Sequence, residues 1–285
     1  CIMTSMFTAL NIVHHGSEAQ KQQYIPKYMR GEQKFAISIS EPQSGSDAAA
    51  ARTKATLDGD EWVLNGNKVW CSGAHLPDTL IVLMARTGPD RYDGLSLFLV
   101  PNDLPGLHIK KMNTIVRRSL GTTEFFLDDV RIPKANLLGE VGKGWKYIGE
   151  HLELERLSIA ASQVGNAQTA LDDTINYTKN RDAFGKPLSS FQVLKHRMAE
   201  NAIEIEAARL LVYSAAAKIA RGERALKEVS MAKVFSADVL FKTAFNGMQA
   251  LGGYAQLPEY DMERYFREAK HGMVGGGARE IQCGI

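Results

Sequence analysis

Cysteine is scarce in this sequence, which has only Cys1, Cys71 and Cys283 among its 285 residues. Their spacing matches neither a disulfide framework nor a metal-ligand motif, so it argues against a secreted, disulfide-stabilised protein and favours a reducing compartment. Long apolar runs are also missing, because none approaches the roughly 18 residues that a membrane-spanning helix requires. We therefore expect no membrane insertion.

Neither sign of charge is in excess. The 34 basic residues nearly balance the 32 acidic ones, for a formal net charge of +2. Without a block of lysine and arginine, nothing indicates binding to nucleic acid or to an anionic membrane surface. The sequence also lacks a Gly-x-Gly-x-x-Gly turn that leads into a long helix, so a Rossmann dinucleotide site is not supported.

The hydrophobic pattern changes twice along the chain, which predicts an α+β protein. Residues 1–32 are typical of two helices, residues 33–135 of a compact antiparallel β domain, and residues 136–285 of an antiparallel bundle of long helices. The first residue is not Met, and Cys1–Val13 resembles the inside of an apolar helix. We therefore expect the sequence to start within a longer chain.

Local signals refine this division. Ser17 and Gln20 have the spacing of a capping box and predict a short helix that extends to Arg30. Asn65-Gly66 between two β-type runs predicts a hairpin with a type I′ turn. Helices are predicted over Trp145–Asn180, Ser190–Arg221, Ala225–Leu251 and Glu259–Lys270.

Glu155 is the first candidate for catalysis. It follows Ile148 and Leu152 and precedes Ile159 at helical spacing, so a carboxylate occupies a stripe that is otherwise apolar. Removal from water makes a carboxylate a stronger base, which suits proton abstraction. The alternative is a structural ion pair with a core-facing arginine. Glu153, on another face, is expected to be a solvated charge.

The segment 38–47 is rich in small, hydroxyl-bearing residues that could offer donors to a phosphate or a heterocycle. Its alternative is an ordinary loop in which Asp47 caps a short alanine-rich helix. Trp70 and Ser72 should share one face of a strand, with Cys71 on the other. That face could hold a flat conjugated ring, or Trp70 could be a core residue. Cys71 is not expected to be a nucleophile.

Two other features are less specific. Gly275-Gly276-Gly277 could let the backbone approach a ligand and lead into a helix N-terminus, or it could be a plain hinge. His14-His15 is expected to be an isolated surface pair rather than part of a metal site, because no His, Cys and carboxylate cluster has metal-ligand spacing.

Five segments stand out for their order along the chain. They are Ile39–Pro42 with Gly45–Asp47, Asn65–Trp70, Phe126–Pro133, Arg181–Lys186 and Gln249–Gly253. Together they resemble the acyl-CoA dehydrogenase family, and the resemblance covers essentially the whole chain. It implies the end of an N-terminal helical domain over 1–32, a middle β domain over 33–135 and a C-terminal antiparallel four-helix bundle over 136–285, assembled as a homotetramer or a dimer of dimers.

The resemblance implies FAD as the cofactor and an acyl-CoA as the substrate. By position, Ser40 is expected to bond the pyrimidine edge of the flavin, Trp70 to pack against the flavin ring, and Ser72 to lie near its reactive nitrogen. Ser46 is expected to reach the flavin pyrophosphate and, with Arg156, to contact the substrate.

A second group of residues resembles those that hold the adenine half of FAD bound to a neighbouring subunit. They are Arg181, Phe184, Gln249 and Gly253. This feature implies an obligate oligomer. It also places the protein in fatty-acid or branched-chain acyl metabolism, in the bacterial cytoplasm or, in a eukaryote, the mitochondrial matrix.

One departure from the family pattern identifies the base. Many members carry a catalytic glutamate in the loop before the final helix, where this chain has Gly276. The isovaleryl-CoA and long-chain branches instead carry it in a Leu-Glu-Arg context, which Leu154-Glu155-Arg156 resembles. The resemblance implies that Glu155 removes the α-proton while the β-hydride passes to the flavin, giving a trans-2-enoyl-CoA. The backbone N–H of Gly276 would stabilise the developing enolate.

Reduced flavin would pass its electrons to an electron-transfer flavoprotein. Two alternatives remain open at this point. The chain could be a non-catalytic FAD- or CoA-binding subunit of a hetero-oligomeric dehydrogenase, which the glycine at position 276 motivates. It could also be a flavin oxidase or monooxygenase, because one fold can support different reactions.

Overall fold

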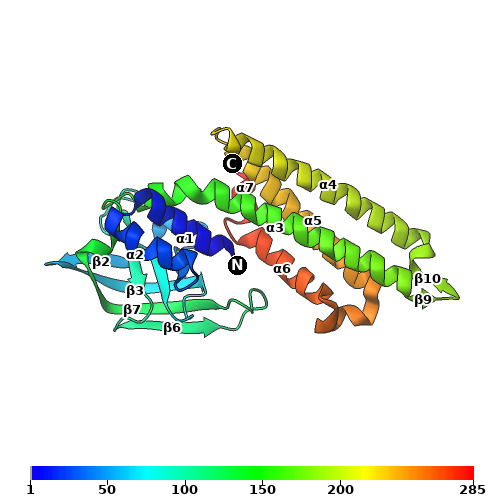
Figure 1. Cartoon of the computed structure of the whole chain (residues 1–285), viewed down its shortest axis with the longest axis horizontal. Coiled ribbons are helices and arrows are strands. Elements are labelled where there is room, and N and C mark those ends of the chain that lie inside the picture. The colour runs from blue at the N-terminus through cyan, green and yellow to red at the C-terminus, as the bar shows by residue number, and fades with distance from the viewer. Residues whose placement is uncertain (1) are drawn as a thin grey trace. The chain divides into compact units, whose positions relative to one another are not determined.

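The computed structural model describes residues 2–285, and their packing forms two units. The N-terminal unit extends to Leu152, and the C-terminal unit is Glu153–Ile285. Figure 1 shows a sheet with two short helices in the first unit and long helices in the second. None of the helices within residues 2–285 is long and apolar enough to cross a membrane.

Two helices begin the N-terminal unit: α1 (Ile2–His15) and α2 (Glu18–Met29). The predicted capping box is present. The Gln20 backbone N–H donates to Ser17 Oγ at 3.2 Å, and the Ser17 N–H donates to Gln20 Oε1 at 3.0 Å. Two donors at the start of α2 are thereby satisfied, which explains why the helix begins there.

The sheet of this unit has eight strands in the order β6-β7-β3-β2-β4-β5-β8, with β1 paired to β4. Their bounds are β1 (Lys34–Ser38), β2 (Lys54–Asp58), β3 (Glu61–Ser72), β4 (Thr79–Arg86), β5 (Leu95–Pro101), β6 (Leu107–Met112), β7 (Thr122–Pro133) and β8 (Leu137–Leu138). Most pairs are antiparallel, which confirms the predicted α+β class. The parallel β1–β4 pair, and one parallel contact between β2 and β4, were not predicted.

The hairpin predicted at Asn65-Gly66 is wrong. Strand β3 runs straight through these residues and pairs with β7 on both sides of them, with a register shift between Leu64 and Gly66. The tight turn lies earlier, because Asp58 pairs with Glu61. Gly66 serves a close approach instead, since a Cβ there would lie 2.7 Å from the Thr53 Cα.

Strand β4 explains how the core of this unit is built. Leu80, Val82 and Met84 pack in one apolar cluster with residues of α1 and α2, whereas Ile81 and Leu83 pack in a second cluster. Both faces of the strand are therefore buried, and its continuous apolar run follows from that burial.

The C-terminal unit is a four-helix bundle, as the resemblance implied. The helices are α3 (Gly144–Asn180), α4 (Gln192–Ala220), α5 (Leu226–Leu251) and α6 (Met262–Val274), followed by the short α7 (Arg279–Cys283). The first turns of α3 belong to the N-terminal unit. One core cluster joins all four long helices, through Leu157 of α3, Ile205 of α4, Val229 of α5 and Ala269 of α6.

Helix α6 starts three residues later than predicted. Pro258–Tyr260 forms a 3-10 turn, and Asp261 has a left-handed backbone with φ of 54° before the helix begins. A short hairpin, β9 (Asp182–Ala183) and β10 (Lys186–Pro187), connects α3 to α4. The predicted tight connection at Gly185-Lys186-Pro187 is this hairpin.

Candidate active site

The Trp70 edge, defined as Ser40, Trp70 and Ser72, is the candidate region of the N-terminal unit. The Val69 N–H donates to the Ser40 carbonyl at 3.0 Å, which holds Ser40 beside β3. The register of β3 against β7 shifts between Lys68 and Cys71, and at this irregularity Trp70 has φ of 65°. The Trp70 side chain is 59% exposed, so the core alternative for this residue is wrong.

Within residues 2–285, neither the Ser40 nor the Ser72 hydroxyl has a hydrogen-bond partner. Cys71 between them points inward, at 1% exposure, in agreement with the predicted alternation. Its thiol donates to the Ile37 carbonyl, and burial raises the pKa of Cys71 to about 12. A thiol with so high a pKa is not a nucleophile at neutral pH. An exposed indole beside two free hydroxyls is the kind of donor set that a flavin ring requires.

A buried ion pair underlies this edge. Lys68 Nζ lies 2.9 Å from Glu41 Oε1 and 3.0 Å from the Ile39 carbonyl, and both side chains are almost fully buried. Glu41 also accepts the backbone N–H groups of Arg52 and Thr53, at 2.7 and 2.9 Å. Burial opposes ionisation of Glu41, but the Lys68 ammonium and these donors outweigh it and lower the pKa of Glu41 to about 2.

The remaining loop residues are less constrained. Ser46 is exposed. Asp47 does not cap the 3-10 turn Ala48–Ala50 through its side chain, so the predicted cap is wrong; its carboxylate instead pairs with Arg91 at 2.5 Å. The loop is shaped by Glu41 and Ser44, which pair with each other through two backbone hydrogen bonds of 3.0 Å.

The candidate region of the C-terminal unit is the glycine loop, defined as Gly275-Gly276-Gly277, with the face of α3 that contacts it. Arg156 Nε donates to the Gly276 carbonyl at 3.1 Å. Lys233 of α5 donates from Nζ to the Gly277 carbonyl at 2.6 Å and more weakly to the Gly272 carbonyl at 3.4 Å. Two cations from different helices therefore hold the carbonyls of this loop.

The backbone conformation at position 276 favours glycine. Its φ is 66°, and a Cβ there would lie 2.7 Å from Cδ1 of Ile159. Ile159 is one turn from Glu155 in the stripe predicted from the sequence, so this face of α3 is directed toward the loop.

Glu155 itself is half-buried and close enough to two cations to affect their ionisation. Burial lowers the pKa of Arg156, and Glu155 opposes that change. Burial and the neighbouring Arg156 guanidinium lower the pKa of Lys233 to about 8, again against the attraction of Glu155. A carboxylate, a guanidinium and an ammonium thus lie around one glycine loop.

Sequence reasoning missed Lys68 and Lys233, and it misread Glu153. The signal for Lys233 was present, because it lies four residues after Val229 and three before Ser236 on the buried face of α5. Glu153 is not simply solvated: its Oε2 accepts the backbone N–H of Ala225, at the start of α5, at 3.0 Å. That contact depends on tertiary folding and leaves no local pattern.

The residues predicted to hold adenine lie at one end of the bundle. Arg181 lines a cavity of about 460 Å³ together with Tyr254 and Tyr260, and its guanidinium lies 5.8 Å from the centre of the Tyr254 ring. Phe184 has φ of 54° and is 95% exposed. Gln249 and Gly253 are exposed as well.

Comparison with known proteins identifies the family. Residues 36–130 match the acyl-CoA dehydrogenase middle domain, and residues 142–285 match the acyl-CoA dehydrogenase C-terminal domain. The chain is 36% identical over 290 residues to the human mitochondrial short-chain specific acyl-CoA dehydrogenase, covering 99% of this chain and 70% of that enzyme. It is also 36% identical to a cyclohexane-1-carbonyl-CoA dehydrogenase of Geobacter metallireducens, covering 95% and 71% of the two chains.

The fold agrees with a solved structure. Butyryl-CoA dehydrogenase from Megasphaera elsdenii superposes with a TM-score of 0.94 at 32% identity, over 100% of this chain and 75% of that one. Members of the family are FAD-dependent oxidoreductases that act on acyl-CoA thioesters. The matched domains, the identity over nearly the whole chain and the superposition lead to one conclusion: this chain belongs to the acyl-CoA dehydrogenase family.

Proposed function

We propose that this enzyme dehydrogenates a fatty or branched acyl-CoA to the trans-2-enoyl-CoA, with Glu155 as the base that removes the α-proton. One observation carries the proposal. The loop position at which many relatives place their glutamate is Gly276, and the Glu155 face of α3 is directed toward that loop through Arg156 and Ile159. A glycine has no side chain to accept a proton, whereas Glu155 supplies a carboxylate on the facing helix.

The electrostatics around Glu155 suit this role. Arg156 and Lys233 are cationic neighbours that favour its ionised form. Both cations also donate to carbonyls of the glycine loop, which holds them beside the carboxylate. We infer that Glu155 starts the reaction ionised and becomes protonated as the α C–H bond breaks.

The proton comes from a weak carbon acid, so negative charge on the thioester oxygen must be stabilised. No backbone carbonyl within the described residues accepts the Gly276 N–H. Arg156 and Lys233 bind the carbonyls of Gly276 and Gly277 and thereby fix the orientation of these peptide groups. We infer that the Gly276 N–H donates to the thioester oxygen.

FAD, when bound, supplies the acceptor for the hydride that leaves the β carbon. The Ser40 and Ser72 hydroxyls and the exposed Trp70 indole fit the edge and face of a flavin ring. We further assign Ser46 to the pyrophosphate and, with Arg156, to the substrate. Arg181, Phe184, Gln249 and Gly253 are assigned to the adenine half of FAD held by a second copy of the chain.

The exposed face of α4 supports such an assembly. Ile203, Leu210 and Tyr213 are 60–69% exposed and return to one face of the helix at spacings of seven and three residues. Large apolar side chains in such a row are typical of an interface. We propose a homotetramer that passes its electrons to an electron-transfer flavoprotein.

The test is anaerobic mixing of the FAD-loaded protein with a panel of acyl-CoAs while the flavin absorbance is followed. Glu155→Gln should slow flavin bleaching by about 10²–10⁴-fold without loss of bound FAD, because it removes the general base alone. Glu153→Gln is the matched control: it lies two residues away, keeps an oxygen for the Ala225 N–H, and should leave the rate unchanged.

Two outcomes would support an alternative function, and a third would exclude Glu155 as the base. If no acyl-CoA bleaches the wild-type flavin, the chain is a non-catalytic FAD- or CoA-binding subunit. If the reduced enzyme consumes oxygen rapidly, the chain is an oxidase. Equal bleaching rates in Glu155→Gln and wild type would exclude Glu155 as the base.

A further inference from the structure

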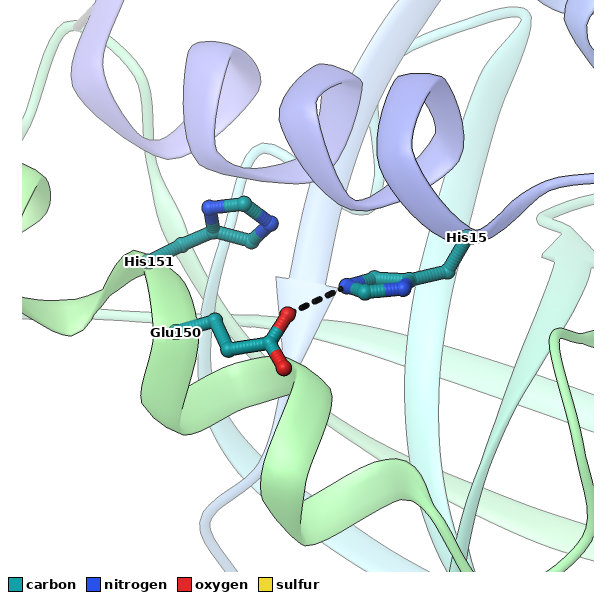
Figure 2. A group of neighbouring side chains, drawn as sticks. All are labelled: His15, Glu150 and His151. Carbon is teal, nitrogen blue, oxygen red and sulfur yellow. Dashed lines mark ion pairs between the residues drawn. The ribbon is translucent and has the colours of Figure 1, made fainter.

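Three side chains outside the candidate active site converge where α1 meets the start of α3. His15 ends α1, and Glu150 and His151 lie in the second turn of α3, all within the N-terminal unit (Figure 2). Each offers one ligand atom, and these atoms all lie within 4.8 Å of one another. His15 Nε2 and Glu150 Oε2 are 3.0 Å apart. The prediction that His14-His15 is an isolated surface pair is therefore wrong for His15.

The two rings are held by packing. His15 stacks on Tyr147 with ring centres 3.8 Å apart and an angle of 17°, and the Tyr147 hydroxyl accepts the Glu140 N–H at 3.3 Å. His151 is buried and meets the ring of Phe7 edge-on, at 6.1 Å. Rings fixed in this way lose little conformational entropy when they bind a ligand.

His15 Nε2 is buried and pairs with Glu150 Oε2 at 3.0 Å, although the contact lacks ideal hydrogen-bond geometry. An imidazole nitrogen and a carboxylate oxygen of the group therefore already face each other (Figure 2).

We propose that His15, Glu150 and His151 bind a divalent cation of the zinc type. Two imidazoles and a carboxylate are ligands that Zn²⁺ prefers, whereas Mg²⁺ and Ca²⁺ require oxygen ligands. Bonds of about 2.1 Å in a tetrahedral site place ligand atoms roughly 3.4 Å apart. The ligand atoms in this structure are separated by 3.0 Å to at most 4.8 Å, a range that includes this distance. The Glu150 side chain is 40% exposed and free to adjust.

The fourth position has two candidates. His14 Nδ1 lies 3.3 Å from His151 Nε2 and could complete the site, with water as the alternative. Lys146 Nζ, 3.9 Å from Glu150 Oε1, is the competing cation, but it is 71% exposed and can withdraw. A bound ion would join helices that lie about 135 residues apart in the chain, which adds stability only when the protein is folded.

Zn²⁺ binding to the EDTA-treated, FAD-loaded protein tests the proposal, by calorimetric titration and by metal analysis after dialysis. Wild type should bind one Zn²⁺ per chain, and Zn²⁺ but not Mg²⁺ should raise the unfolding temperature. Glu150→Gln should weaken binding at least tenfold, as should His15→Phe, which keeps an aromatic ring against Tyr147. His196→Ala, which removes an exposed histidine of α4, should change neither result.

Flavin content and acyl-CoA turnover of both ligand variants should equal those of wild type without added metal, which separates this site from the proposed reaction. The proposal fails if wild type binds no Zn²⁺ at micromolar concentration. It also fails if His15→Phe and Glu150→Gln retain wild-type affinity, since Zn²⁺ would then be bound elsewhere, for example by the exposed Cys283.

Discussion

Each unit of this protein buries one lysine, and the two lysines are neutralised differently. Lys68 in the N-terminal unit meets a carboxylate, Glu41, in a pair shielded from water. Lys233 in the C-terminal unit donates to the backbone carbonyls of Gly272 and Gly277, with Glu155 near enough to raise its pKa. Both side chains are almost fully buried. The two lysines therefore differ in the chemistry of their partners and not in their burial.

This difference between the partners indicates a different role for each lysine. The Glu41 carboxylate cancels the charge of Lys68. The pair therefore holds the loop at Glu41 against β3 and carries no net charge that would act on other groups. Carbonyl dipoles solvate Lys233 without cancelling its charge, and the remaining positive charge attracts Glu155. The first lysine therefore stabilises structure, and the second tunes the proposed base.

The largest expected effect comes from breaking the Lys68–Glu41 pair. Lys68→Met leaves the Glu41 carboxylate buried with two backbone donors and the Gln43 amide but no cation, which should lower the free energy of unfolding by about 3–5 kcal/mol. All three tryptophans precede residue 146, so tryptophan fluorescence during urea unfolding reports the N-terminal unit. Arg131→Met, which breaks half-exposed pairs with Asp58 and Glu61, is the control and should cost about 1 kcal/mol or less.

Adding Glu41→Gln to Lys68→Met should restore part of the lost stability, because it removes the unpaired charge. If the double variant is as unstable as the sum of both single variants, the pair contributes no coupling and the comparison with Lys233 loses its basis.

Lys233→Met should have a smaller effect on stability and a larger one on the reaction. It removes one strong and one weak charged hydrogen bond but also the cost of burying an ammonium, so we expect a loss of about 1–2 kcal/mol by circular dichroism of the helices. Flavin reduction by acyl-CoA should slow at least tenfold because the glycine loop loses an anchor. Lys242→Met, on the exposed side of the same helix, should leave the rate unchanged.

Much of this arrangement was predictable from local patterns. The capping box at Ser17, the long helices and the Glu155 stripe each follow from one period or one motif. The course of β3 could not be predicted in this way, because Asn65-Gly66 has the residues of a turn. Only the pairing with β7 shows that the strand continues through them. The Lys68–Glu41 pair joins residues 27 apart, and no spacing along the chain indicates such a contact.

The candidate regions of the two units also differ in how far sequence patterns predict them. The exposed Trp70 and the buried Cys71 agree with strand alternation, although Trp70 lies within the irregularity of β3. The anchors of the glycine loop are Arg156 of α3 and Lys233 of α5, which lie 120 and 44 residues from the carbonyls they bind. No local sequence pattern predicts contacts over such separations. Lys233 nevertheless carried a signal, as a charge on a buried helical face.

Stability should rise with pH in both units, but over different ranges. The pKa of Glu41 is lowered from 4.5 to about 2, so its contribution is complete above pH 4.5 and is lost as the pH falls toward 2. The pKa of Lys233 is lowered from 10.5 to about 8, so the unfolded chain binds more protons between these values. The C-terminal unit should therefore gain stability as the pH rises from 8 to 10.5, on the order of 2–4 kcal/mol.

Urea unfolding of wild type and Lys233→Met across this range checks the sign. The variant should lack the alkaline gain but keep the acid loss, whereas Lys68→Met should keep the alkaline gain. A gain that persists in Lys233→Met would assign it to another group.

The smallest expected effect concerns the strained aromatic residue of each unit. Trp70 and Phe184 have φ of 65° and 54° and are 59% and 95% exposed. A left-handed backbone costs a bulky residue about 1 kcal/mol. An exposed ring gains little packing energy that could offset this cost, so the stability of the fold alone does not explain these two residues. Cofactor contacts would explain both.

Replacing each residue by Gly and by Ala separates backbone strain from ring contacts. Because only glycine adopts this conformation freely, the Gly variant should exceed the Ala variant in stability by about 1 kcal/mol at both positions. FAD affinity should fall equally in Gly and Ala variants, since both lose the ring. If FAD affinity instead follows backbone stability, the rings do not contact the cofactor. If it falls at Trp70 alone, Phe184 serves the assembly and not FAD.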